Sequence, residues 1–356
     1  MPFLDNKTKI KKLDRANVLG SIERLGMQCS DAWQAASAVS MPASYATVKN
    51  IVINGMGGSA LGGEIIQFLF WEKLKLPLQV INSYTLPGSV NADTLYIVSS
   101  YSGNTEEPLG TVIPALRRGA KVLGIAKGGK IGQLIRAGKF PGYLIQEKHN
   151  PCGQPRMGIG YSVFGQLGLL QQCGVLQLTD REVQPLIKTL KRLNSRFGLN
   201  APQRTNPAKQ IAAQLAGRMP VIVVADFLAG NAHALRNQIN ENAKNFANYF
   251  VVSEMNHHLM EGLRYPRKGN RSLRWLFIDS DQYYPANQKR MAITKRVVDK
   301  NGLDILDYKL HSKTKLEQSF EMLVFGGYVN FYLAMLNRVD PSPIPWVDYF
   351  KAELVK

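Results

Sequence analysis

Apolar runs alternate with segments of helical periodicity along the first half of the chain. Five apolar runs, most of them rich in β-branched residues, predict buried strands at 48–58, 78–83, 94–104, 121–129 and 142–147. Between them, residues 59–74 and 106–120 place apolar side chains at helical spacing and predict helices. Strands that alternate with helices predict βαβ crossovers, and therefore a parallel sheet covered by helices on both faces.

The second half of the chain repeats this rhythm. Its patterns predict strands at 219–226, 249–257, 272–280 and 303–311, and helices at 228–247, 283–300 and 316–337. Between the halves, residues 151–172 begin as a loop and become a glycine-containing apolar helix, which we interpret as the link between domains. The predicted fold class is therefore α/β, with one domain at 1–172 and a second at 173–356.

Length and composition agree with this picture. The 356 residues suggest two domains, at roughly 100–200 residues per domain. No apolar run approaches the ~18 residues that span a bilayer, and residues 1–15 carry lysines without an apolar stretch. We therefore expect no membrane segment and no secretory signal. The three cysteines are sparse and widely spaced, which favours a reducing cytoplasm over a disulfide framework.

Charge and metal-ligand spacing narrow the possible functions. The net charge of +18 is compatible with nucleic acid or with small anionic substrates. Because the basic residues are spread along the chain without a recognised DNA- or RNA-binding pattern, nucleic acid is the less favoured partner. No cysteine pair has metal-ligand spacing, and the adjacent His257 and His258 would make a poor chelate. We expect no metal.

A glycine-rich turn follows the first predicted strand. The stretch GMGGSA at 55–60 fits a GxGxxA dinucleotide fingerprint, but no acidic residue stands in VINSYT at 80–85 to hold a ribose hydroxyl. NAD is therefore not favoured. Ser59 begins a helix, and the free N–H groups of a helix N-terminus bind anions. The stretch predicts either a site for a single phosphate or a plain strand–helix turn capped by Ser59.

A run of small hydroxyl residues follows the third predicted strand. Residues 99–105 read SSYSGNT, where a simple helix cap would need only Thr105. Parallel α/β sheets bind ligands beyond the carboxyl ends of their strands. This run and Ser59 can therefore converge at one edge of the sheet and surround the oxygens of one phosphate.

These segments carry a family resemblance. GMGGSA followed by SYSGNTEE resembles the sugar isomerase (SIS) domain family, which binds phosphosugars. Four later segments resemble the bifunctional phosphoglucose/phosphomannose isomerases: PCGQPR at 151–156, NQINENAK at 237–244, SEMNHHLMEG at 253–262 and the tail at 332–354. The resemblance covers roughly residues 48–354. It implies two SIS-type domains and a cofactor-free interconversion of glucose 6-phosphate or mannose 6-phosphate with fructose 6-phosphate.

The resemblance also implies site residues. The substrate phosphate would be held by Gly58, Ser59, Ser100, Ser102 and Thr105. Glu241 would be the base that moves a proton between C2 and C1, and Arg156 would stand beside the enediolate. Ring opening would fall to Lys351 and to His257 of the partner subunit, which implies a homodimer.

The residues alone leave alternatives open. Without the resemblance, Glu241 is an exposed helix carboxylate, while Arg156 and Lys351 are ordinary solvated cations. The family usually continues after its histidine with Asn and Glu, whereas His258 and Leu259 follow here, so the choice between His257 and His258 stays open. Two rival functions are a non-catalytic phosphosugar sensor and an isomerase of shorter phosphosugars.

Overall fold

Two parallel sheets form the framework of the protein. The computed structural model describes residues 2–354. The first sheet has the strand order β2-β1-β3-β4-β5, and all its neighbouring strands are parallel. Its strands are β1 (Asn50–Asn54), β2 (Leu78–Ile81), β3 (Thr94–Ser99), β4 (Lys121–Ala126) and β5 (Gly142–Leu144). All five predicted strands of the first half are therefore present.

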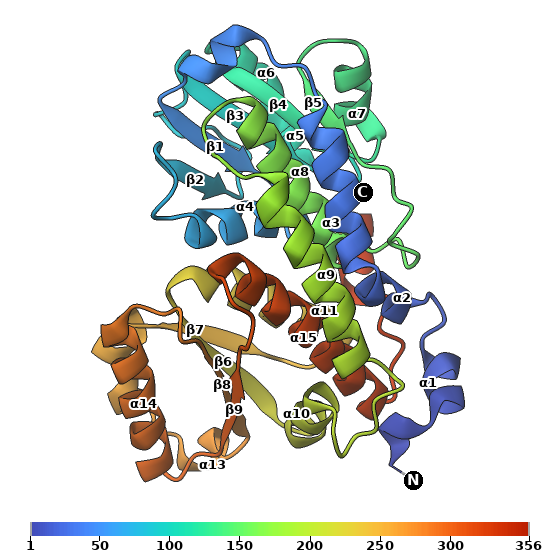
Figure 1. Cartoon of the computed structure of the whole chain (residues 1–356), viewed down its shortest axis with the longest axis vertical. Helices are drawn as coiled ribbons and strands as arrows, with labels where there is room; N and C mark the ends of the chain where they lie inside the picture. Colours follow the sequence, from blue (N-terminus) through green and yellow to red (C-terminus); the bar gives the residue numbers. More distant parts are fainter. Residues whose placement is uncertain (1, 355–356) are drawn as a thin grey trace.

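The second sheet is also parallel, with the order β7-β6-β8-β9. Its strands are β6 (Met219–Ala225), β7 (Asn248–Val252), β8 (Leu273–Asp279) and β9 (Ile305–Lys309). The predicted α/β class with two helix-flanked parallel sheets is confirmed. Figure 1 shows the two sheets in the upper and lower halves of the molecule, with long helices between them.

Helices cover the sheets and connect them. The first half contains α1 (Lys7–Leu13), α2 (Val18–Glu23), α3 (Leu25–Ser37), α4 (Gly58–Leu69), α5 (Glu106–Gly110), α6 (Val112–Arg117), α7 (Gly129–Arg136) and α8 (Ile159–Gln172). The second half contains α9 (Asp180–Phe197), α10 (Pro207–Leu215), α11 (Ala229–Asn242), α12 (Leu259–Gly262), α13 (Arg267–Asn270), α14 (Pro285–Lys300), α15 (Lys315–Leu336) and α16 (Pro345–Leu354). Five short 3₁₀ helices complete the described part: η1 (Phe3–Asp5), η2 (Ala43–Thr47), η3 (Pro155–Met157), η4 (Asp226–Leu228) and η5 (Glu254–His257).

Several predicted boundaries differ from the structure for local reasons. The predicted strand 94–104 ends at Ser99, because the following residues fold into a loop. The predicted helix 106–120 is two short helices that meet at Thr111, whose hydroxyl donates to the carbonyl of Pro108. The helices α1 to α3 precede the first strand, a region for which the pattern gave no prediction.

The segment predicted as the link between domains carries a buried helix. Residues 151–172 contain η3 and α8, and α8 packs against α3 and α4 beside the first sheet. Across the middle of the molecule α11 packs closely on α4, because a Cβ at Gly230 would lie only 2.6 Å from the backbone nitrogen of Ile65. The division of the chain near residue 172 stays a prediction.

Helix α15 is the apolar centre of the second half. An 18-residue window of this 22-residue helix has a mean hydropathy of 1.3, so this one helix of the described chain is long and apolar enough to cross a membrane. The expectation of no such run overlooked it. However, 94% of its apolar window is buried inside the protein, where α9, α10 and α11 pack against it. A core helix passes the same test of length and composition, so this is weak evidence for a membrane segment.

Candidate functional site

Hydroxyl groups gather at the carboxyl ends of β1 and β3. Ser59, in the first turn of α4, is buried, and its Oγ accepts a hydrogen bond of 2.9 Å from the backbone N–H of Tyr101. Ser99 Oγ donates to the carbonyl of Ser59 at 3.0 Å. Strands β1 and β3 are neighbours in the sheet. The strand order reverses between them, because β2 lies on one side of β1 and the later strands lie on the other. This is the place where doubly wound sheets bind ligands.

The loop after β3 is tightly bonded. Ser100 is buried, and its Oγ lies 2.7 Å from the hydroxyl of Thr105 and accepts the N–H of Gly103 at 3.0 Å. Gly103 has φ +79°, and a Cβ there would meet the carbonyl oxygen of Gly128 at 1.8 Å, so only glycine fits. Ser102 is exposed on the same loop. The predicted phosphate-binding residues of this loop therefore form one rigid, hydroxyl-rich turn.

A buried arginine lies next to this turn. Arg156 is only 3% exposed, although a guanidinium is almost never found so deep without partners. Its Nε donates to Asn242 Oδ1, its Nη1 to Gln154 Oε1 at 2.9 Å, and its Nη2 to the carbonyls of Pro341 and Ser342 at 2.9 and 2.7 Å. Burial lowers the pKa of this guanidinium, against the opposing charge of Glu241. The arginine stays a fixed cation at neutral pH.

Glu241 faces Arg156 from the last turn of α11. Its Oε2 lies 3.4 Å from Arg156 Nη1, and its side chain is 32% exposed. Partial burial raises the pKa of this carboxyl, while the positive charges of Arg156, Lys244 and Lys351 act in the opposite direction. A carboxylate with a raised pKa, open to solvent on one side and facing a cation on the other, can accept a proton beside a developing negative charge.

The N-terminus of α4 joins the hydroxyl turn to the segment that carries Arg156. Ser59 bonds the backbone of Tyr101 in the turn, and Gly58 lies against the Arg156 segment. A Cβ at Gly58 would lie 3.0 Å from the carbonyl oxygen of Pro155 and 3.2 Å from the Cα of Arg156. Glycine at this position therefore lets the N-terminus of α4 approach the arginine segment closely. The structure brings Gly58, Ser59, Ser100, Thr105, Arg156 and Glu241 into one region.

Lys351 comes to the same region on α16. Its charge acts on Glu241, and the charge of Asp348 on the same helix acts on Arg156. Helix α16 buries none of its described residues, and it exposes large apolar side chains at Trp346, Tyr349 and Phe350. Lys351 thus lies near the pair on a helix that packs little against its own chain.

The structure does not bring His257 to the other site residues. It lies in η5, after β7, is exposed, and its side chain makes no hydrogen bond or ion pair within the described residues. His258 is engaged differently: its Nε2 lies 2.9 Å from Glu254 Oε2. Within one chain, the predicted histidine is therefore separate from the Arg156–Glu241 pair.

Sequence reasoning missed the amide network that holds Arg156. Asn242 accepts from the arginine and donates to Asn330 Oδ1 at 2.7 Å. Asn330 in turn donates to Gln238 Oε1 at 3.2 Å, and Gln238 donates to the backbone carbonyl of Arg156 at 3.1 Å. One signal could have pointed to Asn330, because it is a lone amide within the apolar stretch of α15, and a buried amide requires partners.

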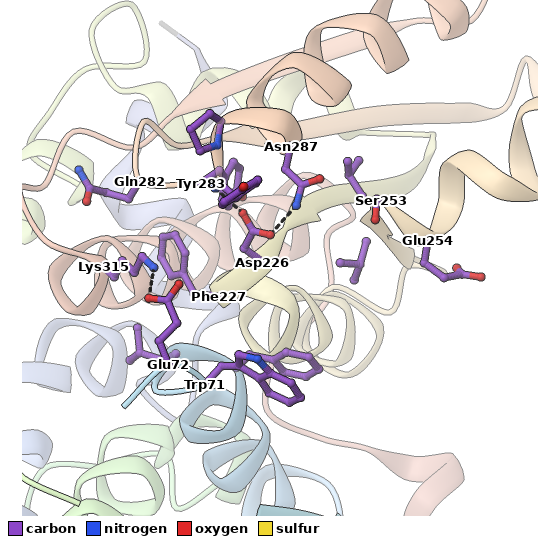
Figure 2. A pocket seen from close by; sticks show the side chains of 16 residues that line it. Trp71, Glu72, Asp226, Phe227, Ser253, Glu254, Gln282, Tyr283, Asn287 and Lys315 are labelled. Atoms are coloured by element: carbon purple, nitrogen blue, oxygen red, sulfur yellow. Dashed lines mark hydrogen bonds and ion pairs between the residues drawn. The ribbon is translucent and has the colours of Figure 1, made fainter. Parts of the chain in front are cut away.

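A separate cavity of about 690 Å³ lies at the carboxyl edge of the second sheet. Figure 2 shows Asp226 at its centre, with Glu72 and Lys315 paired on one side and Ser253 and Glu254 on the other. None of the predicted phosphate-binding or catalytic residues lines this cavity. Nor do the described residues gather three or more His, Cys, Asp or Glu side chains that could hold a metal ion.

The fold and the site together define a class of protein: a doubly wound α/β protein with hydroxyl groups gathered at the carboxyl ends of two neighbouring strands. Among solved structures, a hypothetical protein from Thermus thermophilus has a TM-score of 0.75 at 14% identity, covering 98% of this chain and 93% of that one. The bacterial phospho-glucose isomerase C-terminal SIS domain family matches residues 204–354.

Curated relatives identify the family. The bifunctional phosphoglucose/phosphomannose isomerase of Caldicellulosiruptor bescii is 31% identical over 94% of this chain and 98% of its own. The protein of the same name from Aquifex aeolicus is 32% identical over 86% of this chain and 91% of its own. The chain belongs to the bifunctional phosphoglucose/phosphomannose isomerase family, as its motifs predicted.

Proposed function

We propose that this protein interconverts glucose 6-phosphate and mannose 6-phosphate with fructose 6-phosphate. The observation that carries this proposal is the Arg156–Glu241 pair, which adjoins the N-terminus of α4 and its Ser59. An aldose–ketose isomerase must hold a phosphate, move a proton between C1 and C2, and stabilise an enediolate. The family relatives and the geometry of these residues support the same reaction.

The phosphate is held by the loop after β3 together with the N-terminus of α4. Its ligands are Gly58, Ser59, Ser100, Ser102 and Thr105. Ser59 Oγ already accepts the N–H of Tyr101, and this contact leaves its hydroxyl hydrogen to donate to a phosphate oxygen. The N-terminus of the 12-residue helix α4 adds a favourable dipole for an anion.

Glu241 is the base that removes the proton from C2 and returns it to C1. The raised pKa of its carboxyl makes it a stronger base than an exposed glutamate. Arg156, fixed by four further acceptors, stabilises the enediolate oxygen without having to reorganise. The presence of Glu241 and Arg156 argues against a sensor function. A sensor would need only the residues that hold the phosphate.

Ring opening uses Lys351 of the same chain and His257 of the partner subunit. Two observations support a homodimer. The side chain of His257 is exposed and has no bonding partner among the described residues of its own chain, and α16 exposes large apolar side chains. His258 is already paired with Glu254, which favours His257 as the free imidazole. A second copy that covers α16 would also fix the position of Lys351.

Subunit complementation tests the shared site. His257→Ala and Glu241→Gln are each expected to be inactive. A hybrid dimer carries one site with both functional residues, so random re-association should restore about a quarter of wild-type activity. If mixing restores nothing although native mass spectrometry, which resolves the hybrid from the two homodimers, shows that hybrids form, His257 acts within its own chain or not at all.

The reaction itself is tested with purified protein and no added metal. Fructose 6-phosphate should form from glucose 6-phosphate and, separately, from mannose 6-phosphate. Binding of both sugars without turnover would instead establish the phosphosugar sensor.

The three cysteines are free and buried, which supports a location in the reducing cytoplasm.

A further inference from the structure

The end of α11 is tied to a distant segment by one lysine. Lys244 lies just after the helix with φ +53°, and its ammonium donates to the carbonyl of Glu241 and, at 3.3 Å, to the carbonyl of Pro341. Helix C-termini leave carbonyls unpaired, and a cation there is favourable. The lysine therefore bonds the backbone of the very residue that carries the proposed base.

The carbonyl of Pro341 is shared by two cations. Arg156 Nη2 donates to it at 2.9 Å, and Lys244 approaches it from the end of α11. The same segment leads directly into α16, which carries Lys351. Lys244 thus connects the backbone of Glu241 to the carbonyl of Pro341. That carbonyl also bonds Arg156, and its segment leads to the helix that carries Lys351.

The lysine is not needed to hold the helix end. Asn337, at the end of α15, already donates to the carbonyl of Ala243 at 2.9 Å, and the N–H of Ala243 bonds the carbonyl of Ile239. Lys244 is also exposed, and an exposed lysine that only stabilised the fold would contribute little. Its placement is more specific than such a role requires.

We propose that Lys244 is a positioning residue of the isomerase: its ammonium fixes Glu241 opposite Arg156 and supplies a positive charge that keeps the carboxylate ionised. The inference rests on the proposed function. It assigns a role to a residue to which the motif resemblance gave none.

The charges around the lysine agree with this role. Although Lys244 is exposed as a whole, the desolvation of its ammonium and the charge of Arg156 lower its pKa to about 8, against the opposing charges of Asp340 and Glu241. Around Glu241, the positive charges of Arg156, Lys244 and Lys351 all lower the pKa of the carboxyl. Loss of the Lys244 charge should therefore raise the pKa of Glu241.

Two substitutions separate charge from structure. Lys244→Met keeps the length of the side chain without its charge, and we expect kcat/KM to fall about 10- to 100-fold through misplacement of the base. The acid limb of the pH profile should move up by about half a unit to one unit, as expected on removal of a nearby opposite charge from a partly solvated carboxylate. Lys49→Met, which removes a surface lysine paired with Asp93, is the control and should change neither.

Lys244→Arg keeps the charge and titrates far above neutral pH. It should retain most of the activity, and the alkaline limb of the pH profile, expected near the pKa of Lys244 in the wild type, should move to higher pH. A Lys244→Met enzyme with unchanged kcat/KM and an unmoved acid limb overturns the proposal. So does a Lys244→Arg enzyme whose alkaline limb stays where the wild type has it.

A titration independent of turnover separates this proposal from the proposed reaction. The carboxyl resonance of Glu241 can be followed in protein labelled with ¹³C at the glutamate carboxyl, and Glu241→Gln assigns it by its loss. Its pKa should be higher in Lys244→Met than in the wild type. An equal pKa in the two proteins overturns the positioning role, whereas absence of sugar turnover in the wild type overturns the proposed function alone.

Discussion

The carboxyl edges of the two sheets share a topology and differ in chemistry. The orders β2-β1-β3-β4 and β7-β6-β8-β9 are the same, so β6 corresponds to β1 and β8 corresponds to β3. Beyond β1 and β3 lie the hydroxyls of Ser59 and Ser100. Beyond β6 lies Asp226, whose carboxylate accepts the N–H of Tyr284 at 2.7 Å and the side chain of Asn287. The first edge carries hydroxyl groups, whereas the second carries the carboxylate of Asp226.

This difference explains how one repeated architecture can carry the one proposed phosphate site. Tyr284 immediately precedes α14, so the carboxylate of Asp226 accepts a hydrogen bond at that helix N-terminus, where we expect an anion to be favoured. Asp226 has φ +47°, a conformation that aspartate tolerates better than most residues. The side chains beyond the strand ends, rather than the strand order, distinguish the two edges.

Among the substitutions that compare the two edges, removal of the base should have the largest effect on activity. Glu241→Gln keeps the shape of the side chain but cannot accept the proton, so we expect kcat to fall by about 10²- to 10⁴-fold while phosphosugar binding persists. Steady-state kinetics and calorimetric binding measure the two quantities.

A matched substitution at the second edge is the control. Glu72→Gln changes an exposed carboxylate that lines the cavity of Figure 2, and it should leave kcat unchanged. Near wild-type turnover in Glu241→Gln would contradict the assignment of the base.

The phosphate cradle should give the next largest effect. Ser59→Ala combined with Thr105→Ala removes two hydroxyl donors, and hydrogen bonds to a charged group contribute about 1.5–3 kcal/mol each. We expect KM to rise at least tenfold, with a smaller change in kcat. Ser253→Ala, at the cavity of the second edge, should leave KM unaltered. An unchanged KM in the double variant would place the cradle elsewhere.

The sequence predicted the framework because strand and helix patterns are local. Each predicted strand is an apolar run, and burial on both faces of a parallel sheet requires such runs. The hydroxyl turn was also visible, because Ser100 to Thr105 are consecutive and their mutual bonds are short-range. Both features depend on neighbours in the chain.

The surroundings of Arg156 could not be predicted in the same way. Two of its acceptors are the backbone carbonyls of Pro341 and Ser342, about 185 residues away, and a backbone carbonyl has no signature in the residue type. Lys244 acts through carbonyls as well, so it reads in the sequence as one of 44 basic residues. In the proposed homodimer, the position of His257 relative to Glu241 would depend on a second copy, which no periodicity in one chain reports.

Asp226 gives the smallest expected effect on activity and the most direct test of the comparison. Asp226→Ala leaves the N–H of Tyr284 and the amide of Asn287 without their acceptor, which should lower the free energy of unfolding by about 1–3 kcal/mol. Isomerase kinetics should stay near wild type, because Asp226 belongs to the other edge. Inorganic phosphate can then enter the vacated place, so it should stabilise Asp226→Ala more than the wild type or Asp226→Asn, whose amide oxygen still fills the position. Denaturant unfolding with and without phosphate measures this difference. If phosphate stabilises all three proteins equally, the carboxylate of Asp226 does not stand where an anion would bind, and the two edges differ by more than one side chain.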